Sequence, residues 1–276
     1  MTVSDDTHVV AKRIEVAPEG TLIIGPDARN VRLELIQDDC RGPSAPFPDD
    51  TSAVHASACL RFGQLVSRGL TRIDAAPVTS WTVMKKDANA GARSIQVNEC
   101  DGWTVGANIA IANGAGQNNA QEHVISDIEG SNCIVGLASP LSQVVRSFTG
   151  FTTGSLVPLE VLYLKRNVVI TGTMIGRDSE PKFRQGIVVS QRNTGVLQLS
   201  NALVENCGRI FQGEYCVHLH LLGSSPSSLI EGNAIINGIS KGITVHGTHH
   251  SSVADNVVYN IKGVGIYVEN GKGEIG

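Results

Sequence analysis

The sequence is poor in aromatic residues and has no long apolar run. Only 4% of its 276 residues are Phe, Trp or Tyr, whereas 30 residues are glycine. No stretch approaches the roughly 20 apolar residues that a membrane-spanning helix requires, so we expect no membrane span within the chain. Few aromatics, many glycines and the lack of a helical apolar pattern favour an all-β protein with many turns.

Clusters of lysine and arginine are also missing, and the formal net charge is −4. Because surfaces that bind nucleic acid are strongly basic, we expect no nucleic acid partner. The segment Met1–His8 lacks the apolar core of a secretory signal. The sequence shows no glycine loop for phosphate binding, no N-glycosylation sequon and no convincing Ser-His-Asp order.

What the chain does have is an internal repeat near its C-terminal end. Three pairs of equivalent residues lie 23 positions apart: Asn233 and Asn256, Gly242 and Gly265, and Val245 and Val268. Short β-branched runs at such a period, broken by Asn and Gly, are typical of a solenoid. Looser copies begin at Asn201 and Asn167, which gives four rungs with insertions in the turns.

These rungs predict a right-handed parallel β-helix over residues 159–276. A β domain is expected over 13–145, after a loose leader at 1–12. The sequence stops directly after a rung, whereas solenoids cover their last rung, so we expect it to be a fragment truncated at the C-terminus. The recurring asparagines are expected to form a ladder of turn hydrogen bonds.

Side chains on a strand alternate between faces, so the repeat assigns each residue a direction. The inward residues are expected to be Ile187, Val189, Val217, Leu219, Ile243, Val245, Ile266 and Val268. A first outward row holds Ser190, His220, His246 and Glu269, and a second outward row holds Val188, His218, Thr244 and Tyr267. Stacked strands lie about 4.8 Å apart, which should make His220, His246 and Glu269 close neighbours on the surface.

Two imidazoles and a carboxylate suit several kinds of site. His220, His246 and Glu269 can ligate a divalent metal such as zinc or calcium, act as a catalytic acid and base, or hold a sugar chain. His218, Thr244 and Tyr267 would extend that binding surface, with Tyr267 as a stacking face. The alternative is a polar surface that only keeps the solenoid soluble.

Six cysteines are present, none with the CxxC spacing of a metal site. Cys207 and Cys216 bracket an insertion between the two halves of one rung, where a disulfide would pin a loop. Buried free thiols are the alternative interpretation.

Several phrases resemble a known group of proteins. They include Asp101-Gly-Trp-Thr-Val-Gly106, Val161-Leu-Tyr-Leu-Lys-Arg-Asn167, Gly213-Glu-Tyr-Cys-Val-His218 and Gly265-Ile-Tyr-Val-Glu269. In this order they resemble the G-eight domain and the following β-helix of fibrocystin, fibrocystin-like proteins, the cell-migration-inducing hyaluronan-binding protein and the transmembrane hyaluronidase. The resemblance covers the chain from about Leu65 to its end.

The resemblance implies a pectin-lyase-like solenoid in an extracellular or membrane-anchored protein that interacts with a glycan such as hyaluronan. Four positions depart from the residues common in that group: Ala107, Ser224, Val264 and Asn270. These departures argue against retained hyaluronidase activity. We therefore expect a carbohydrate-interacting module that is not catalytic. The alternatives are a structural ectodomain that binds protein partners and, more remotely, a polysaccharide lyase or hydrolase.

Overall fold

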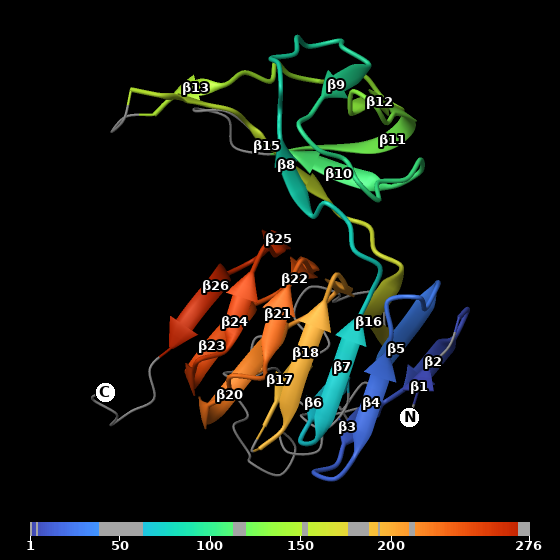
Figure 1. Cartoon of the computed structure of the whole chain (residues 1–276), viewed down its shortest axis with the longest axis vertical. Helices are drawn as coiled ribbons and strands as arrows, with labels where there is room; N and C mark the ends of the chain where they lie inside the picture. The colour runs from blue at the N-terminus through green and yellow to red at the C-terminus, as the bar shows by residue number, and fades with distance from the viewer. Residues whose placement is uncertain are drawn as a thin grey trace, which may run out of the picture. The chain divides into compact units, whose positions relative to one another are not determined.

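The computed structural model describes residues 2–3, 5–38, 63–112, 120–150, 154–175, 188–192, 194–209 and 213–269. Within these residues every regular element is a β-strand (Figure 1). In the same residues no helix is long and apolar enough to cross a membrane. The chain divides into one unit of residues 1–76 and 167–276 and a second unit of residues 77–166.

The first unit is a parallel β-helix built from three sheets of six strands each, and each rung adds one strand to every sheet (Figure 1). The first sheet contains β1 (Thr2–Val3), β4 (Thr21–Ile24), β7 (Leu70–Asp74), β18 (Val196–Ser200), β21 (Leu229–Glu231) and β24 (Ser252–Ala254). The second contains β2 (His8–Ala11), β5 (Val31–Asp38), β16 (Val168–Ile175), β19 (Leu203–Glu205), β22 (Ala234–Gly238) and β25 (Val257–Ile261). The third contains β3 (Arg13–Val16), β6 (Gln64–Ser67), β17 (Val188–Gln191), β20 (Val217–Ser224), β23 (Lys241–His249) and β26 (Val264–Glu269). The predicted parallel β-helix is therefore confirmed.

The alternating apolar residues of the three sheets form the core of the β-helix. Leu35, Leu65, Ile73, Leu197 and Leu219 belong to it, and each is fully buried. Short runs of Val, Leu and Ile suit this arrangement because each strand turns one face inward and the other outward. The solenoid is thus held together by contacts between neighbouring rungs.

Glycines allow the turns of successive rungs to stack closely. A Cβ atom at Gly69 would overlap the carbonyl oxygens of Ala17 and Gly20, and one at Gly195 would overlap the carbonyl oxygen of Ser67. These oxygens belong to backbone that cannot move away without breaking the neighbouring ladder. Glycine is required here for close approach.

The second unit is an antiparallel β domain inserted into the solenoid between β7 and β16. Its main sheet has the order β8 (Trp81–Val83), β15 (Glu160–Tyr163), β10 (Asn108–Ile111), β11 (Gln121–Glu129), β12 (Ile134–Leu137) and β9 (Ser94–Gln96). A short hairpin of β13 (Phe148–Thr149) and β14 (Leu156–Val157) accompanies it. The domain has its own core, in which the rings of Trp103 and Tyr163 stack 5.2 Å apart.

The predicted domain boundaries are wrong on both sides of this insertion. Residues 2–11 are not a loose leader, because they form β1 and β2, which pair in parallel with β4 and β5. Strands β3 to β7 supply further rungs, while 159–166 belong to the inserted domain. Alternation reveals that a strand is half buried but not which strand it pairs with. The pattern therefore cannot distinguish the early rungs of the solenoid from the strands of an antiparallel domain.

The two ends of the insertion meet within the β-helix unit. The backbone N–H of Ala76 donates to Oδ1 of Asn167 over 3.1 Å. One residue further on, Val168 pairs with Val31 of the preceding rung. The chain therefore leaves the solenoid and returns to it at nearly the same point.

The expected asparagine ladder forms only in part. Asn233 donates through Nδ2 to Oδ1 of Asn256 over 2.9 Å, one rung apart. Asn201 is out of line, since the backbone N–H of Ala202, not an amide of Asn201, donates to Oδ1 of Asn233. Asn201 instead occupies a left-handed turn position with a φ of 55°, which asparagine tolerates better than most residues.

Two disulfides close loops in the described residues. Of the two alternatives that the sequence left open for Cys207 and Cys216, the disulfide is the one that forms, and a second bond joins Cys100 to Cys133 in the inserted domain. Cys40 and Cys59 lie outside the described residues. Cys216 immediately precedes β20, so its disulfide fixes the segment that leads into the candidate site.

Candidate functional site

The candidate site lies on the outer face of the third sheet, where β20, β23 and β26 are parallel neighbours. The register pairs His220 with His246, and His246 with Glu269. The first outward row of these three residues is therefore confirmed. Parallel pairing of equivalent residues stacks their side chains one above the other on the sheet.

The row does not extend to β17 as the sequence predicted. Ser190 pairs with His218, not with His220, so it aligns with the second outward row. A shift of two residues keeps the same inward and outward alternation, and only the ladder can reveal it. Val188 and Val189 move with it, since Val189 pairs with Val217, while Ile187 lies outside the described residues.

The inward direction is confirmed for Val217, Leu219 and Ile243, which are fully buried. Val245 is half buried and packs against the core. Ile266 and Val268 pair with Ile243 and Val245, so they occupy the predicted inward positions, yet they are exposed by 52% and 78%. Both belong to β26, which no further strand covers in the part of the chain that the structure describes.

His218 faces outward from the β-helix, yet it is not open to solvent. Its side chain is 1% exposed, whereas His220 and His246 are half buried. The ring of Tyr215 packs on it with the ring centroids 4.9 Å apart. Thr244, its partner on β23, is also fully buried. The prediction that His218 and Thr244 form an accessible binding surface is therefore wrong, because both are buried and Tyr215 packs on His218.

The hydrogen bond of His218 determines its tautomer. Its Nδ1 lies 2.8 Å from the carbonyl oxygen of Gly213. A carbonyl only accepts, so Nδ1 carries the proton and Nε2 keeps a free lone pair. This buried Nε2 has no hydrogen-bond partner among the described residues.

The imidazole rings of His220 and His246 lie close to the ring of His218. The ring centroid of His218 lies 4.9 Å from that of His220 and 5.9 Å from that of His246. The rings of His220 and His246 are 5.1 Å apart. One nitrogen from each ring lies within 4.8 Å of the other two. The structure thus joins His218, rather than Glu269, to the pair that the sequence singled out.

Two of the three rings, those of His218 and His220, are favoured in the neutral form because their pKa values are lowered. Burial lowers the pKa of His218 to about 3, with His220 and His246 adding to the effect. Burial also lowers the pKa of His220, and the neighbouring His246 lowers it further. Neutral imidazoles are the form that ligates metals or accepts hydrogen bonds.

Lys241 connects the site to two aromatic rings. Its Nζ lies 3.7 Å from a carboxylate oxygen of Glu269 and donates to the hydroxyl of Tyr215 over 3.1 Å. The same ammonium lies 3.6 Å from the ring centroid of Tyr267. Glu269 is therefore held by a lysine, and Tyr267 is half buried beneath the same cation.

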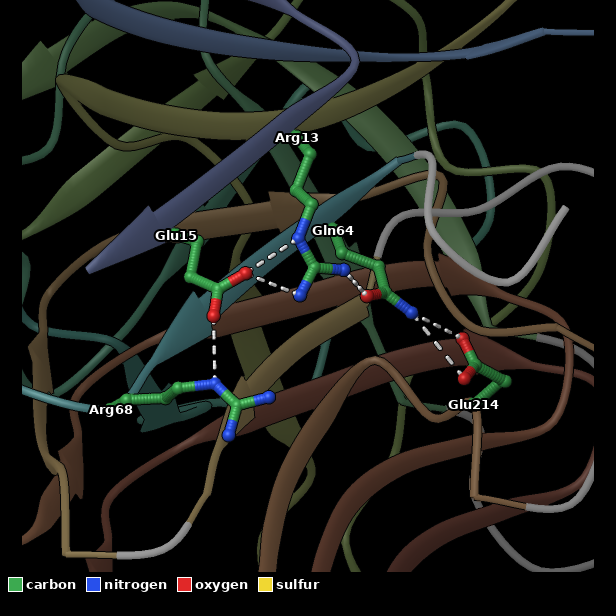
Figure 2. A network of polar contacts seen from close by, with 5 residues as sticks. All are labelled: Arg13, Glu15, Gln64, Arg68 and Glu214. Carbon is green, nitrogen blue, oxygen red and sulfur yellow. Dashed lines mark hydrogen bonds and ion pairs between the residues drawn. The ribbon is translucent and has the colours of Figure 1, made fainter. Parts of the chain in front are cut away.

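A polar network anchors the segment that covers His218 (Figure 2). Gln64 of β6 donates through Nε2 to the carboxylate of Glu214, at 3.1 Å from Oε2. Arg13 of β3 donates to Oε1 of the same Gln64 (Figure 2). On the other side, Arg209 lies 3.4 Å from Glu214, and both side chains are buried. Glu214 thus ties the segment to the earlier rungs.

The sequence reasoning missed this network and also missed Arg192, whose charge acts on His218 and His220. Arg13 and Gln64 were assigned to a separate domain, so their proximity to Glu214 was hidden. A signal was nevertheless present. Glu214 and Tyr215 lie inside the loop that Cys207 and Cys216 close, just before β20, where a disulfide-closed segment would fold over its own strand.

The fold and this outer face define the chain as a parallel β-helix protein with an inserted antiparallel β domain and a histidine-rich site. Residues 185–275 match the family model of the CEMIP beta-helix. The chain is 27% identical over 308 residues to fibrocystin-L of Mus musculus, covering 95% of this chain and 7% of that protein. It is 25% identical over 197 residues to a G8 domain-containing protein of Dictyostelium discoideum, covering 70% of this chain and 13% of that protein.

Among solved structures, the chain is similar to the tailspike of Acinetobacter baumannii bacteriophage AP22, determined in complex with a capsular saccharide. The sequence identity is 11%, with 98% of this chain and 38% of that chain covered and a TM-score of 0.27. The predicted resemblance to the fibrocystin and hyaluronan-binding group is confirmed by the sequence matches. This chain corresponds to only a small part of the length of these relatives.

Proposed function

We propose that this chain is a non-catalytic module that binds an acidic polysaccharide on the outer face of its third sheet. The observation that carries the proposal is the row of His220, His246 and Glu269 on three adjacent rungs. All three side chains are half buried, so each still has surface that a ligand can reach. Imidazole and carboxylate groups supply the donors and acceptors that sugar hydroxyls require.

Two cations beside this row favour an acidic glycan over a neutral one. Arg192 exerts its charge on His218 and His220. Lys241 adds a second positive charge at the other side of the row. A guanidinium pairs well with a carboxylate such as that of a uronic acid. Tyr267 adds an aromatic ring at the same face.

The place of action that we propose is the cell surface or the extracellular space. Two disulfides stabilise the described residues, and disulfides persist mainly in oxidising compartments. The similarity to fibrocystin-L supports the same assignment. A glycan partner outside the cell is consistent with both observations.

Calorimetric titration with hyaluronan oligosaccharides tests the proposal, with neutral N-acetylglucosamine oligomers as the comparison ligand. We expect binding of the acidic ligand only, and a weakening of at least about tenfold in a His220→Ala, His246→Ala double variant. The melting temperature should change little, because partly exposed positions contribute little stability. Binding should also weaken with salt, as screening reduces charge attraction.

The matched control is His249→Ala with His250→Ala, which removes the exposed histidine at the end of β23 and the exposed histidine directly after it. This control should bind like the unaltered protein. If the unaltered protein binds no acidic glycan, or if both double variants bind equally well, the proposal is wrong.

Size-exclusion chromatography of hyaluronan after incubation tests the non-catalytic part. We expect the chain length to remain unchanged with or without chelator, because Ala107 and Ser224 depart from the residues common in the hyaluronidase group. If the protein shortens hyaluronan and the His220→Ala, His246→Ala variant does not, the non-catalytic part of the proposal is wrong and the chain is a depolymerase.

A further inference from the structure

The inference concerns the buried imidazole of His218 and is independent of glycan binding. Burying a polar atom without a hydrogen bond costs free energy, and native proteins avoid it. His218 Nε2 is such an atom among the described residues. Its other nitrogen is already committed to the carbonyl oxygen of Gly213, so the ring cannot relieve the cost by exchanging its tautomer.

We propose that Nε2 of His218 and one ring nitrogen each of His220 and His246 bind a single divalent transition-metal ion, with zinc as the best fit. The backbone carbonyl of Gly213 then acts as the outer partner of a ligand. Metal-binding histidines almost always donate their second N–H to a carbonyl or carboxylate, which orients the ring and leaves the ligating nitrogen free.

The arrangement on the strands supports one shared ion. His218 and His220 are two residues apart on β20, so they share a face, and His246 is the direct partner of His220 on β23. One nitrogen of each of the three rings lies within 4.8 Å of the other two. Nitrogens on a tetrahedral zinc lie about 3.3 Å apart, as follows from Zn–N bonds of about 2.0–2.1 Å. Small rotations of the half-buried His220 and His246 rings supply this closure.

Three nitrogen donors determine the metal class. Imidazole suits zinc, copper, nickel and cobalt, whereas calcium and magnesium require oxygen ligands. This favours zinc over the calcium alternative that the sequence left open. Three protein ligands leave the fourth position of a tetrahedral ion to water or a bound ligand.

Charged side chains near the three histidines affect the binding of a cation in opposite directions. Arg192 opposes a cation here, because its charge acts on both His218 and His220. The carboxylate of Glu269 acts on His220 in the opposite sense. Glu269 also lies 3.7 Å from Lys241, so it balances charge and is not required as a ligand.

The proposal is tested by adding Zn²⁺ or Co²⁺ to the complete chain after dialysis against a chelator. We expect one zinc per chain by elemental analysis, visible absorption bands of tetrahedral cobalt, and a rise in melting temperature with zinc but not with Ca²⁺. A His218→Asn variant keeps an N–H near Gly213 but lacks Nε2. Its zinc affinity should fall more than about 100-fold, because loss of an outer partner alone costs 10–100-fold.

The matched control is His123→Asn in the inserted domain. His123 is also buried, and its Nε2 has no hydrogen-bond partner among the described residues, but it belongs to no histidine cluster there. Its variant should bind zinc like the unaltered protein. Absence of saturable zinc binding, or an equal loss in both variants, overturns the proposal. Melting without metal shows whether each variant folds, and glycan titration of the metal-free protein shows separately whether the proposed function holds.

Discussion

Glu15 of β3 shows how a single residue makes the stability of the first rungs depend on pH. Its carboxylate accepts hydrogen bonds from Arg13 and Arg68 (Figure 2). The hydrogen bond from Arg13 is the largest effect on its pKa, which lies below the ordinary value of 4.5, although burial opposes the shift. The ionised form is therefore favoured more strongly in the folded chain than in the unfolded chain.

A Glu15→Gln variant should lose this pH-dependent stabilisation. Above pH 4.5 the carboxylate is ionised in both states and its full contribution is present. As the pH falls, the unfolded chain binds the proton first, so the contribution declines and vanishes below the folded pKa. Urea unfolding from pH 7 to pH 3 should show the gap between the two proteins closing over this range. A gap that stays constant with pH would contradict the assignment.

At the same scale, the sequence placed His220, His246 and Glu269 correctly in one row but misjudged the burial of His218. A strand pattern states which side of the sheet a residue faces, yet not whether another segment covers that side. The cover comes from Glu214 and Tyr215, whose position depends on Gln64, 150 residues away in the sequence. No local pattern contains that contact.

The loop between β19 and β20 is the element on which the candidate site depends. The Cys207–Cys216 disulfide closes it, and Gly213 within it accepts the hydrogen bond from His218. The closed loop is short, with a sequence separation of 9. Loop-closure entropy predicts a contribution of about 2–3 kcal/mol for a bond of this span.

Replacing both cysteines, Cys207→Ala with Cys216→Ala, should therefore lower the free energy of unfolding by about 2–3 kcal/mol. Hydrogen exchange should become faster in the segment from Gly213 to His218, because its restraint is lost. The matched control is Cys100→Ala with Cys133→Ala, which removes the other disulfide in the inserted domain. Exchange near His218 that responds equally to both pairs would show that the loop is not held by its own disulfide.

Strand type and direction were predictable for the rungs after the inserted domain because these rungs repeat the same apolar alternation. The shift of β17 by two residues was not predictable, because the turns between rungs vary in length. The predicted position of Asn201 is also wrong by one residue, because Ala202, not Asn201, aligns with Asn233 in the ladder. Spacing in the sequence therefore predicts the register only where successive rungs have nearly the same length, as in β20, β23 and β26, and not at β17.

At the scale of the whole molecule, the main feature is a domain inserted between two rungs. The sequence predicted two consecutive domains, because strands on both sides of residue 77 share one composition. Only the pairing of β5 with β16 shows that residues 31–38 and 168–175 are adjacent. The fold class was thus predictable, whereas the order of domains was not.

Deletion of residues 77–166, with Ala76 joined to Asn167 through a short Gly-Ser linker, should leave a folded β-helix. The reason is that the N–H of Ala76 already reaches Oδ1 of Asn167 and both cores are separate. Circular dichroism should retain a β spectrum and a cooperative melt. A Val31→Asp variant of the shortened chain is the control, because it places a charge in the solenoid core and should not fold. A shortened chain that aggregates like this control would contradict the modular arrangement.

The insertion also imposes an order on folding during synthesis. Strands β1 to β7 emerge first, but β5 must wait for β16 before its second edge is paired. Ninety residues separate Ala76 from Asn167, and closing a long flexible loop costs entropy. If the inserted domain folds as soon as it emerges, it brings its own ends together and shortens the search. Until then the nascent chain exposes an unpaired strand edge. The time that the inserted domain takes to fold therefore limits when the next rung of the solenoid can form.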